Sequence, residues 1–293
     1  MANSRLFCFG LGYSAGALAR RLMAKGWRIA GTCRSEESRA AMARLGIEAW
    51  LFDGERPMAD WNAALAGSTH LLSAVPPGPE GDPVLALHGG DLALLCGLAW
   101  IGYLSTTGVY GDRGGGWVDE GSELKPTGER GRRRVAAEAA WLALRNEGEL
   151  PVHLFRLAGI YGPGRSAFDA LRQGRAQRID KPGQVFSRIH VEDVAQVLEA
   201  SMAKPRPGAV YNVCDDDPAP PAEVVAHAAD LLGLAPPPLV PFAEARLSEM
   251  ARSFYDDNKR VRNDRIKQAL GVRLAYPDYR AGLAAILKAE RAR

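Results

Sequence analysis

The sequence has 293 residues, of which 47% are hydrophobic and 24% are charged, which is typical of a globular protein with a sizeable core. Its 37 basic and 34 acidic residues leave a net charge of +3, too balanced to indicate a nucleic-acid partner or a membrane surface. The four cysteines form no CxxC pair and no cluster with histidine, and no apolar run reaches the roughly 20 residues of a membrane helix. We therefore expect a cytoplasmic protein that holds no metal and binds a small molecule.

Short apolar runs alternate with segments of helical period through the first half of the chain. Strands are predicted at RLFCFG, WRIAGT, IEAWLF, HLLSAV, WIGYLS and VHLFRL, with helices between them. This alternation is typical of an α/β protein with a Rossmann doubly wound parallel sheet, which binds ligands beyond the carboxyl ends of its strands. The residues that follow each strand are therefore the candidates for a binding site.

The pattern changes at about Tyr161, where connections rich in proline and glycine join shorter elements. We expect a Rossmann domain over residues 1–160, to which residues 188–214 return. A smaller substrate-binding lobe is expected over residues 161–187 and 215–293. This lobe is the least patterned part of the chain, so the sequence identifies no particular substrate.

A glycine-rich turn, FGLGYSAG, stands between the first strand and the first helix, and it has the form G-x-G-x-x-[AG]. The first glycine permits a tight turn, the second lets the backbone approach a pyrophosphate, and the small third residue lets helix and strand pack closely. The N-terminus of the helix offers free N–H groups to phosphates. Because the motif lies at the first strand-helix junction, it predicts a dinucleotide site rather than a plain turn. The expected contacts are Gly10, Gly12, Tyr13, Ser14 and Ala15.

The second strand ends in GTCRSEE, so Arg34 and Ser35 stand about 20 residues after the glycines. A site selective for NAD usually carries Asp or Glu there, to bind the ribose hydroxyl. A guanidinium instead pairs with a 2′-phosphate, and a serine hydroxyl adds a donor. The sequence therefore favours NADP over NAD. The alternative is that Arg34 is merely solvated and Ser35 only caps the next helix.

Other residues after strands complete the expected cofactor site. Asp53 follows the third strand and lies either near the adenine or in a simple turn. Ala74 and Pro76 follow the fourth, where the backbone would line the cofactor and proline would stiffen it without offering a donor. His190 precedes a helix and is interpreted as structural rather than catalytic.

Several segments occur together in one order: the glycine turn, STTGVYG, RLAGIYGPGR, SRIHVEDVAQVLEA and VYNVCDDDPAP. In order and approximate spacing they resemble the extended short-chain dehydrogenase/reductases, or NAD-dependent epimerase/dehydratase family, and more closely its atypical members. A C-terminal segment, NKRVRNDRIKQALGVRLAYPDYRAGL, is also similar to one that recurs in the family. The resemblance implies a nicotinamide cofactor and a polar substrate such as a nucleotide sugar. Family members often pair through helices beside the sheet, and the apolar DLALLCGLAW is compatible with a homodimer or with burial on its own sheet.

The resemblance also assigns catalytic places. A Ser or Thr after the fifth strand binds the substrate oxygen, a later tyrosine is the acid/base, and a lysine one helical turn further binds the nicotinamide ribose. Matching STTGVYG puts Thr106 in the first place, and matching the helix on Glu138 puts Arg130 and Arg134 in the other two. No tyrosine lies between positions 111 and 160, so no shift of this match recovers the acid/base.

The missing tyrosine leaves two functions open. A guanidinium stays protonated at physiological pH, so Arg130 can hold an anion but cannot exchange a proton, while Arg134 can still serve the ribose. The first possibility is an NADP-dependent oxidoreductase or epimerase-like enzyme whose proton passes through Thr106, Tyr110, water or a substrate group. The second is an NADP(H)-binding sensor or scaffold with little turnover. The run RGRRR equally fits a solvated basic face, which is mildly unfavourable at a helix start.

Overall fold

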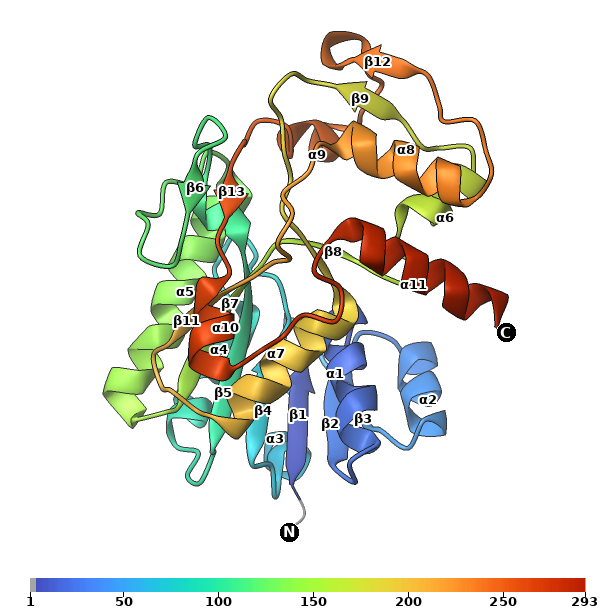
Figure 1. The fold of residues 1–293 in the computed structure, drawn as a ribbon. Helices are drawn as coiled ribbons and strands as arrows, with labels where there is room; N and C mark the ends of the chain where they lie inside the picture. The colour runs from blue at the N-terminus through green and yellow to red at the C-terminus, as the bar shows by residue number, and fades with distance from the viewer. Residues whose placement is uncertain (1–3, 293) are drawn as a thin grey trace.

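The computed structural model describes residues 4–292, apart from the side chains of residues 146–148. Its centre is a seven-stranded parallel sheet of order β11-β7-β5-β4-β1-β2-β3 (Figure 1). The strands are β1 (Arg5–Phe9), β2 (Arg28–Cys33), β3 (Glu48–Leu51), β4 (His70–Ser73), β5 (Trp100–Thr106), β7 (Val152–Leu157) and β11 (Val210–Val213). This order is that of a doubly wound sheet, so the predicted fold class is confirmed. The short β11 was not among the predicted strands, because four residues carry little periodicity.

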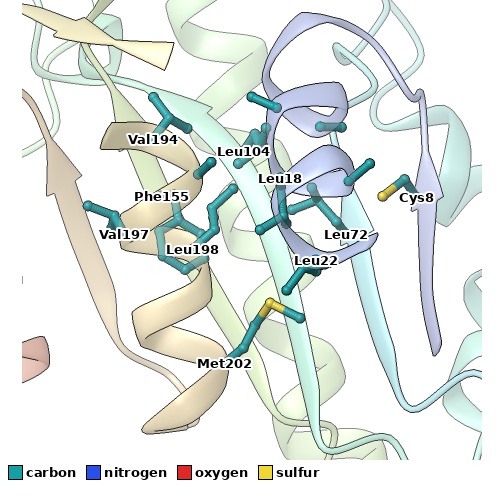
Figure 2. Close-up of a cluster of buried hydrophobic side chains, with 14 of the residues drawn as sticks. Cys8, Leu18, Leu22, Leu72, Leu104, Phe155, Val194, Val197, Leu198 and Met202 are labelled. Atoms are coloured by element: carbon teal, nitrogen blue, oxygen red, sulfur yellow. The ribbon is translucent and has the colours of Figure 1, made fainter. Parts of the chain in front are cut away.

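Helices cover both faces of the sheet, because successive residues of a strand point to opposite sides. In β1, Leu6 and Cys8 face the core that α1 and α7 cover, and Phe7 and Phe9 face the core under α3, α4 and α5. Figure 2 shows the first of these cores, where side chains of α1 and α7 meet over the sheet. The helices are α1 (Tyr13–Met23), α2 (Glu36–Arg44), α3 (Trp61–Leu65), α4 (Pro83–Ala93), α5 (Glu129–Gly148) and α7 (Val191–Ala203).

A smaller lobe lies beyond the carboxyl ends of the strands (Figure 1). Its short parallel pairs are β8 with β10 and β9 with β12. The lobe contains β8 (Gly159–Tyr161), α6 (Ala167–Arg172), β9 (Arg178–Asp180), β10 (Arg188–His190), α8 (Pro221–Leu231), β12 (Leu239–Pro241), η2 (Phe242–Glu244), α9 (Glu249–Ser253) and α11 (Tyr279–Arg291).

Part of the C-terminal sequence returns to the Rossmann domain, which corrects the expected lobe of residues 215–293. The helix α10 (Asp264–Leu270) buries Ile266 and Leu270 in the core of α1 and α7, so apolar burial holds it against the sheet. Before it, β13 (Arg260–Val261) pairs in parallel with β6 (Trp117–Val118), which follows β5 in the chain.

Three observations bear on the expectations about a membrane, a metal ion and a dimer interface. Within the described part of the chain, none of the helices combines the length and apolar character that a bilayer crossing needs. The same residues contain no cluster of His, Cys, Asp or Glu suited to a metal ion. In the segment DLALLCGLAW, Leu92 is buried on the protein's own sheet, whereas Leu94 is 81% exposed.

Candidate functional site

The glycine turn is tied to the neighbouring strand and is open on its outer side. Gly10 has φ +75°, and its N–H donates to Thr32 Oγ1 at 2.8 Å, while the Leu11 N–H donates to the Thr32 carbonyl at 3.1 Å. A Cβ added to Gly12 would meet no atom of the described residues within 4 Å. Directly after Gly12, α1 begins without a side-chain cap, so its first N–H groups remain available to an anion.

The first residues of α1 link this turn to the core and to the lobe. Ser14 is buried, and the small Ala15 is fully buried in the core of α1 and α7. Tyr13 instead faces the lobe, where its hydroxyl donates to the Pro163 carbonyl at 3.0 Å. The guanidinium of Arg165 lies 5.7 Å from the centre of the Tyr13 ring. The segment after β8 therefore contacts the N-terminus of α1.

The residues after β2 have separate roles. Arg34 is exposed and forms no ion pair or hydrogen bond among the described residues. Ser35 caps α2, since its Oγ accepts the N–H of Ser38 at 3.2 Å. Ser35 is thus the cap of α2, which was one of the two roles that the sequence allowed. The guanidinium of Arg34 is exposed and has no ion-pair partner among the described residues.

The segments after β3 and β4 lie in different surroundings. The Asp53 carboxylate accepts the N–H groups of Glu55 and Arg56 and forms an ion pair with Arg56 at 3.0 Å, as expected of a turn aspartate. The Ala74 N–H donates to the Phe9 carbonyl at 2.9 Å, which brings the chain after β4 alongside the glycine turn. Pro76 follows on this segment and is exposed.

Thr106 lies at the end of β5, where it is half-buried. Its Oγ1 accepts the Gly108 N–H at 3.1 Å and so caps the short helix η1 (Thr107–Tyr110). This hydrogen bond uses a lone pair of the hydroxyl and leaves its hydrogen available to another acceptor.

The arginines in the first two turns of α5 lie in different surroundings. Arg132 and Arg133 are paired with the exposed Glu129 on the surface, which is the solvated basic face that the sequence allowed. Arg134 turns inward, and its Nη1 donates to the Leu104 carbonyl at 2.7 Å and to the Tyr103 hydroxyl at 2.9 Å. Arg134 is thereby anchored at the end of β5.

Arg130 contacts the lobe. Its exposed guanidinium lies 5.9 Å from the ring centre of Phe254, which follows α9 and is 56% exposed. No other partner of the Arg130 side chain occurs within the described residues. Thr127, at the turn before α5, donates to Asp257 and so fastens this turn to the chain near Phe254.

Tyr110 lies in the interior, where its hydroxyl cannot face a nicotinamide. The residue is fully buried, its hydroxyl donates to Asn212 Oδ1 at 2.7 Å, and it accepts from Arg156 Nη1 at 2.9 Å. Burial raises the pKa of this tyrosine, which further opposes a role in proton transfer. The proposed catalytic role of Tyr110 is corrected for this reason.

A buried polar network, which sequence reasoning missed, joins Tyr110 to α5. Arg156 on β7 forms an ion pair with Glu138 at 2.7 Å, and the Ser105 hydroxyl donates to the same carboxylate. The signal in the sequence was the arginine inside the apolar strand VHLFRL, since a charge in a buried strand requires a partner.

His190 occupies a structural position. Its Nδ1 accepts the Glu192 N–H at 3.3 Å and caps α7, and its ring packs 4.0 Å from that of Tyr276. Burial lowers the pKa of His190 to about 4, so the imidazole is neutral at physiological pH. Tyr161 is buried beside it and donates to the Asp278 carbonyl.

Comparisons with known proteins agree with this architecture. The model of the NAD dependent epimerase/dehydratase family matches residues 46–214. Protein YeeZ of Escherichia coli strain K12 is 30% identical over 281 residues, which cover 92% of this chain and 95% of that protein. A conserved protein of unknown function from Silicibacter pomeroyi DSS has a solved structure that is 56% identical, with a TM-score of 0.91 over 98% of this chain and 99% of that one.

A more distant structure, MoeE5 in complex with UDP-glucose and NAD, is 20% identical and shares the fold, with a TM-score of 0.77 over 99% of each chain. The predicted resemblance is therefore confirmed at the level of the family. The chain belongs to the NAD dependent epimerase/dehydratase family.

Proposed function

We propose that the protein is a nicotinamide-dinucleotide-dependent enzyme, an oxidoreductase or epimerase-like catalyst acting on a polar small molecule. The observation that carries this proposal is the glycine turn, which is open beside Gly12 and leads into an uncapped α1. A pyrophosphate fits such a turn, since backbone N–H groups and the helix dipole both favour an anion. The bound dinucleotide would accept or supply the hydride.

The chain's own residues then divide the remaining work. Arg134, anchored on the Leu104 carbonyl, keeps free guanidinium nitrogens for the ribose hydroxyls. Thr106 can donate its hydroxyl hydrogen to a substrate oxygen, because Gly108 fixes the orientation of Oγ1. Arg130 can bind a negatively charged group of the substrate. The proton passes through Thr106, water or a substrate group, and not through Tyr110.

NADP is the proposed cofactor, because the exposed Arg34 has no partner among the described side chains and can pair with a 2′-phosphate. MoeE5, which shares the fold, was solved with NAD and UDP-glucose, which makes NAD the competing cofactor and a nucleotide sugar a substrate to include in any test.

The decisive experiment uses NADPH with deuterium at one face of the nicotinamide. The protein is incubated with a panel of carbonyl compounds that includes keto-sugar nucleotides, and products are analysed by mass spectrometry. Transfer of deuterium from one face supports the enzyme. Binding of the cofactor without transfer to any compound would favour the second candidate, a cofactor-dependent sensor or scaffold. Two observations favour that candidate: Arg130 stands where the family resemblance implies a tyrosine, and Tyr110 is buried.

A further inference from the structure

A pocket of about 390 Å³ lies in the lobe, between the chain after β8 and the helices α6, α8 and α11. Its size falls within the range of small-molecule sites, which is about 300 to 1,000 Å³. Its lining residues include neither Thr106 nor any residue of η1 or α5, so it is separate from the site of Thr106 and Arg130. We name it the arginine pocket because Arg165, Arg175 and Arg188 line it.

The arginine pocket carries more positive than negative charge, with three arginines and the single carboxylate of Asp169 among its lining residues. Among the described residues, none of its three arginines forms an ion pair. The pocket also contains Asp169, but this carboxylate accepts the Ser166 N–H at 2.7 Å and the Ser166 hydroxyl at 2.8 Å. Asp169 therefore serves the capping box of α6 and forms no ion pair with the three arginines.

Arg188 is held in place by backbone rather than by an acid. Its Nη1 donates to the carbonyls of Phe186 at 2.7 Å and Ala219 at 2.9 Å. The nearby Asp215 is buried, which raises the pKa of its carboxyl to about 8, so this group is largely uncharged at neutral pH. A desolvated guanidinium with no ionised partner favours an anion supplied from outside.

The rest of the pocket is apolar and aromatic. Tyr161, Val224 and Leu283 are among its lining residues, and Tyr161 is held by its hydrogen bond to the Asp278 carbonyl. Such a surface suits a hydrocarbon or aromatic body, with the charged group of the ligand turned to the arginines.

We propose that the arginine pocket binds an organic oxyanion, in which a carboxylate or phosphate group meets the arginines and an apolar body contacts Tyr161, Val224 and Leu283. Arg165 also lies over the ring of Tyr13, so the ligand would adjoin the segment that contacts the glycine turn. This site does not depend on hydride transfer and stands apart from the proposed function.

Isothermal titration calorimetry of the full chain tests the site at constant ionic strength, with phenyl phosphate, benzoate, benzyl alcohol and inorganic phosphate as probes. We expect phenyl phosphate or benzoate to bind, benzyl alcohol not to bind, and inorganic phosphate to bind at least about tenfold more weakly than the better organic anion. The stronger of the two organic anions distinguishes a phosphate ligand from a carboxylate. Absence of binding by both, or equal binding of inorganic phosphate, overturns the proposal.

Variants locate the site. Arg175→Gln and Arg188→Gln should each weaken the organic anion by about 10- to 100-fold, the usual effect of losing a charged hydrogen-bond partner. Arg188→Lys retains the charge and guards against a folding defect, and it should keep part of the affinity. Arg246→Gln removes an exposed arginine of the same lobe that lies outside the pocket, and it should bind as the wild type does. Unchanged affinity in both Arg175→Gln and Arg188→Lys contradicts the assignment.

The thermal shift given by NADPH is measured in the same variants as an independent readout of the cofactor site. Arg175→Gln should retain the thermal shift given by NADPH, because Arg175 is not placed in the cofactor or reaction site. Loss of anion binding with this shift retained supports the arginine pocket. An absent NADPH shift in the wild type counts against the proposed function and leaves the pocket to be judged by the anion titration.

Discussion

Gly10 and Gly12 are expected to respond differently to substitution by alanine. A Cβ on Gly10 would lie 3.2 Å from Val75 Cγ2 at a backbone φ of +75°, so Gly10→Ala should destabilise the fold by roughly 1 kcal/mol. Gly12→Ala meets no described atom, so it should alter folding little while blocking the approach of a pyrophosphate. We expect Gly12→Ala to unfold in urea almost as the wild type does and to lose NADPH binding. Normal NADPH affinity in this variant would place the cofactor elsewhere.

Arg34 is the residue on which cofactor selectivity is proposed to depend. Replacing it with Asp removes the partner of a 2′-phosphate and supplies a carboxylate that can accept from a ribose hydroxyl. Arg34→Asp should therefore lower the affinity for NADPH by at least about tenfold and raise that for NADH. Arg44→Asp, an equal charge change at an exposed position of α2, is the control. If the ratio of the two affinities changes as little as in the control, Arg34 does not select the cofactor.

Asp215 gives the folding stability a pH dependence of known sign. Its pKa of about 8 in the folded state lies above the ordinary 3.8, so the folded chain binds the extra proton. This contribution to stability is complete below pH 3.8 and is lost as the pH rises to about 8. Buried His70 and His190, with pKa near 4 against an ordinary 6.5, act in the opposite sense as the pH rises from about 4 to about 7.

From about pH 7 to 8 the unfolded histidines, whose ordinary pKa is 6.5, are mostly neutral, so the effect of Asp215 is best measured in this window. The free energy of unfolding should lose about 1 kcal/mol there through Asp215 in the wild type. Asp215→Asn, which cannot ionise, should flatten this fall, whereas Asp230→Asn at an exposed carboxylate of α8 should keep it. Urea unfolding at several pH values measures the free energy of unfolding. Parallel pH profiles for Asp215→Asn and the wild type would show that Asp215 does not cause the fall.

The helix α5 shows how one element meets three environments along its length. Arg130 contacts the lobe, Arg134 reaches the end of β5, and Glu138 is buried against Arg156. Glu138→Gln would leave the Arg156 charge buried without its partner, and the expected loss of stability is about 3 to 5 kcal/mol. Urea unfolding followed by circular dichroism measures this loss.

The matched control for this variant is Glu129→Gln, which removes a fully exposed carboxylate from the same helix and should leave the unfolding midpoint unchanged. The double variant Glu138→Leu with Arg156→Met should recover much of the stability, because it removes both charges together. A Glu138→Gln protein as stable as the control would mean that Arg156 finds another partner.

Elements were predictable from the sequence where they are long and strictly periodic. The strands β1 to β5 and β7 carry apolar runs that local patterning reveals, and the glycine turn is a local motif. The pairs β6 with β13 and β8 with β10 are short and join residues distant in the chain, so no local pattern predicts them. The same reason explains why the burial of Tyr110 was not predicted, because its partners Asn212 and Arg156 come from strands distant in the chain.

The whole molecule should report cofactor binding through its thermal stability. A ligand at 100 times its dissociation constant stabilises the native state by about 2.7 kcal/mol, which raises the melting temperature of a chain of this size by roughly 5 to 10 °C. We expect this shift with NADPH and a smaller one with NADH at equal concentration. If neither cofactor shifts the transition, the proposed function fails.

The pairing of β6 with β13 has a consequence for the order in which the protein matures on the ribosome. The chain between β5 and α5 is completed by residues near the C-terminus, because β6 pairs with β13 and the Asn258 N–H donates to Asp112. The first strands and their helices can assemble as they emerge, whereas this segment must wait for almost the entire polypeptide. A truncated translation product should therefore have the glycine turn and lack the finished surroundings of η1 and Arg130.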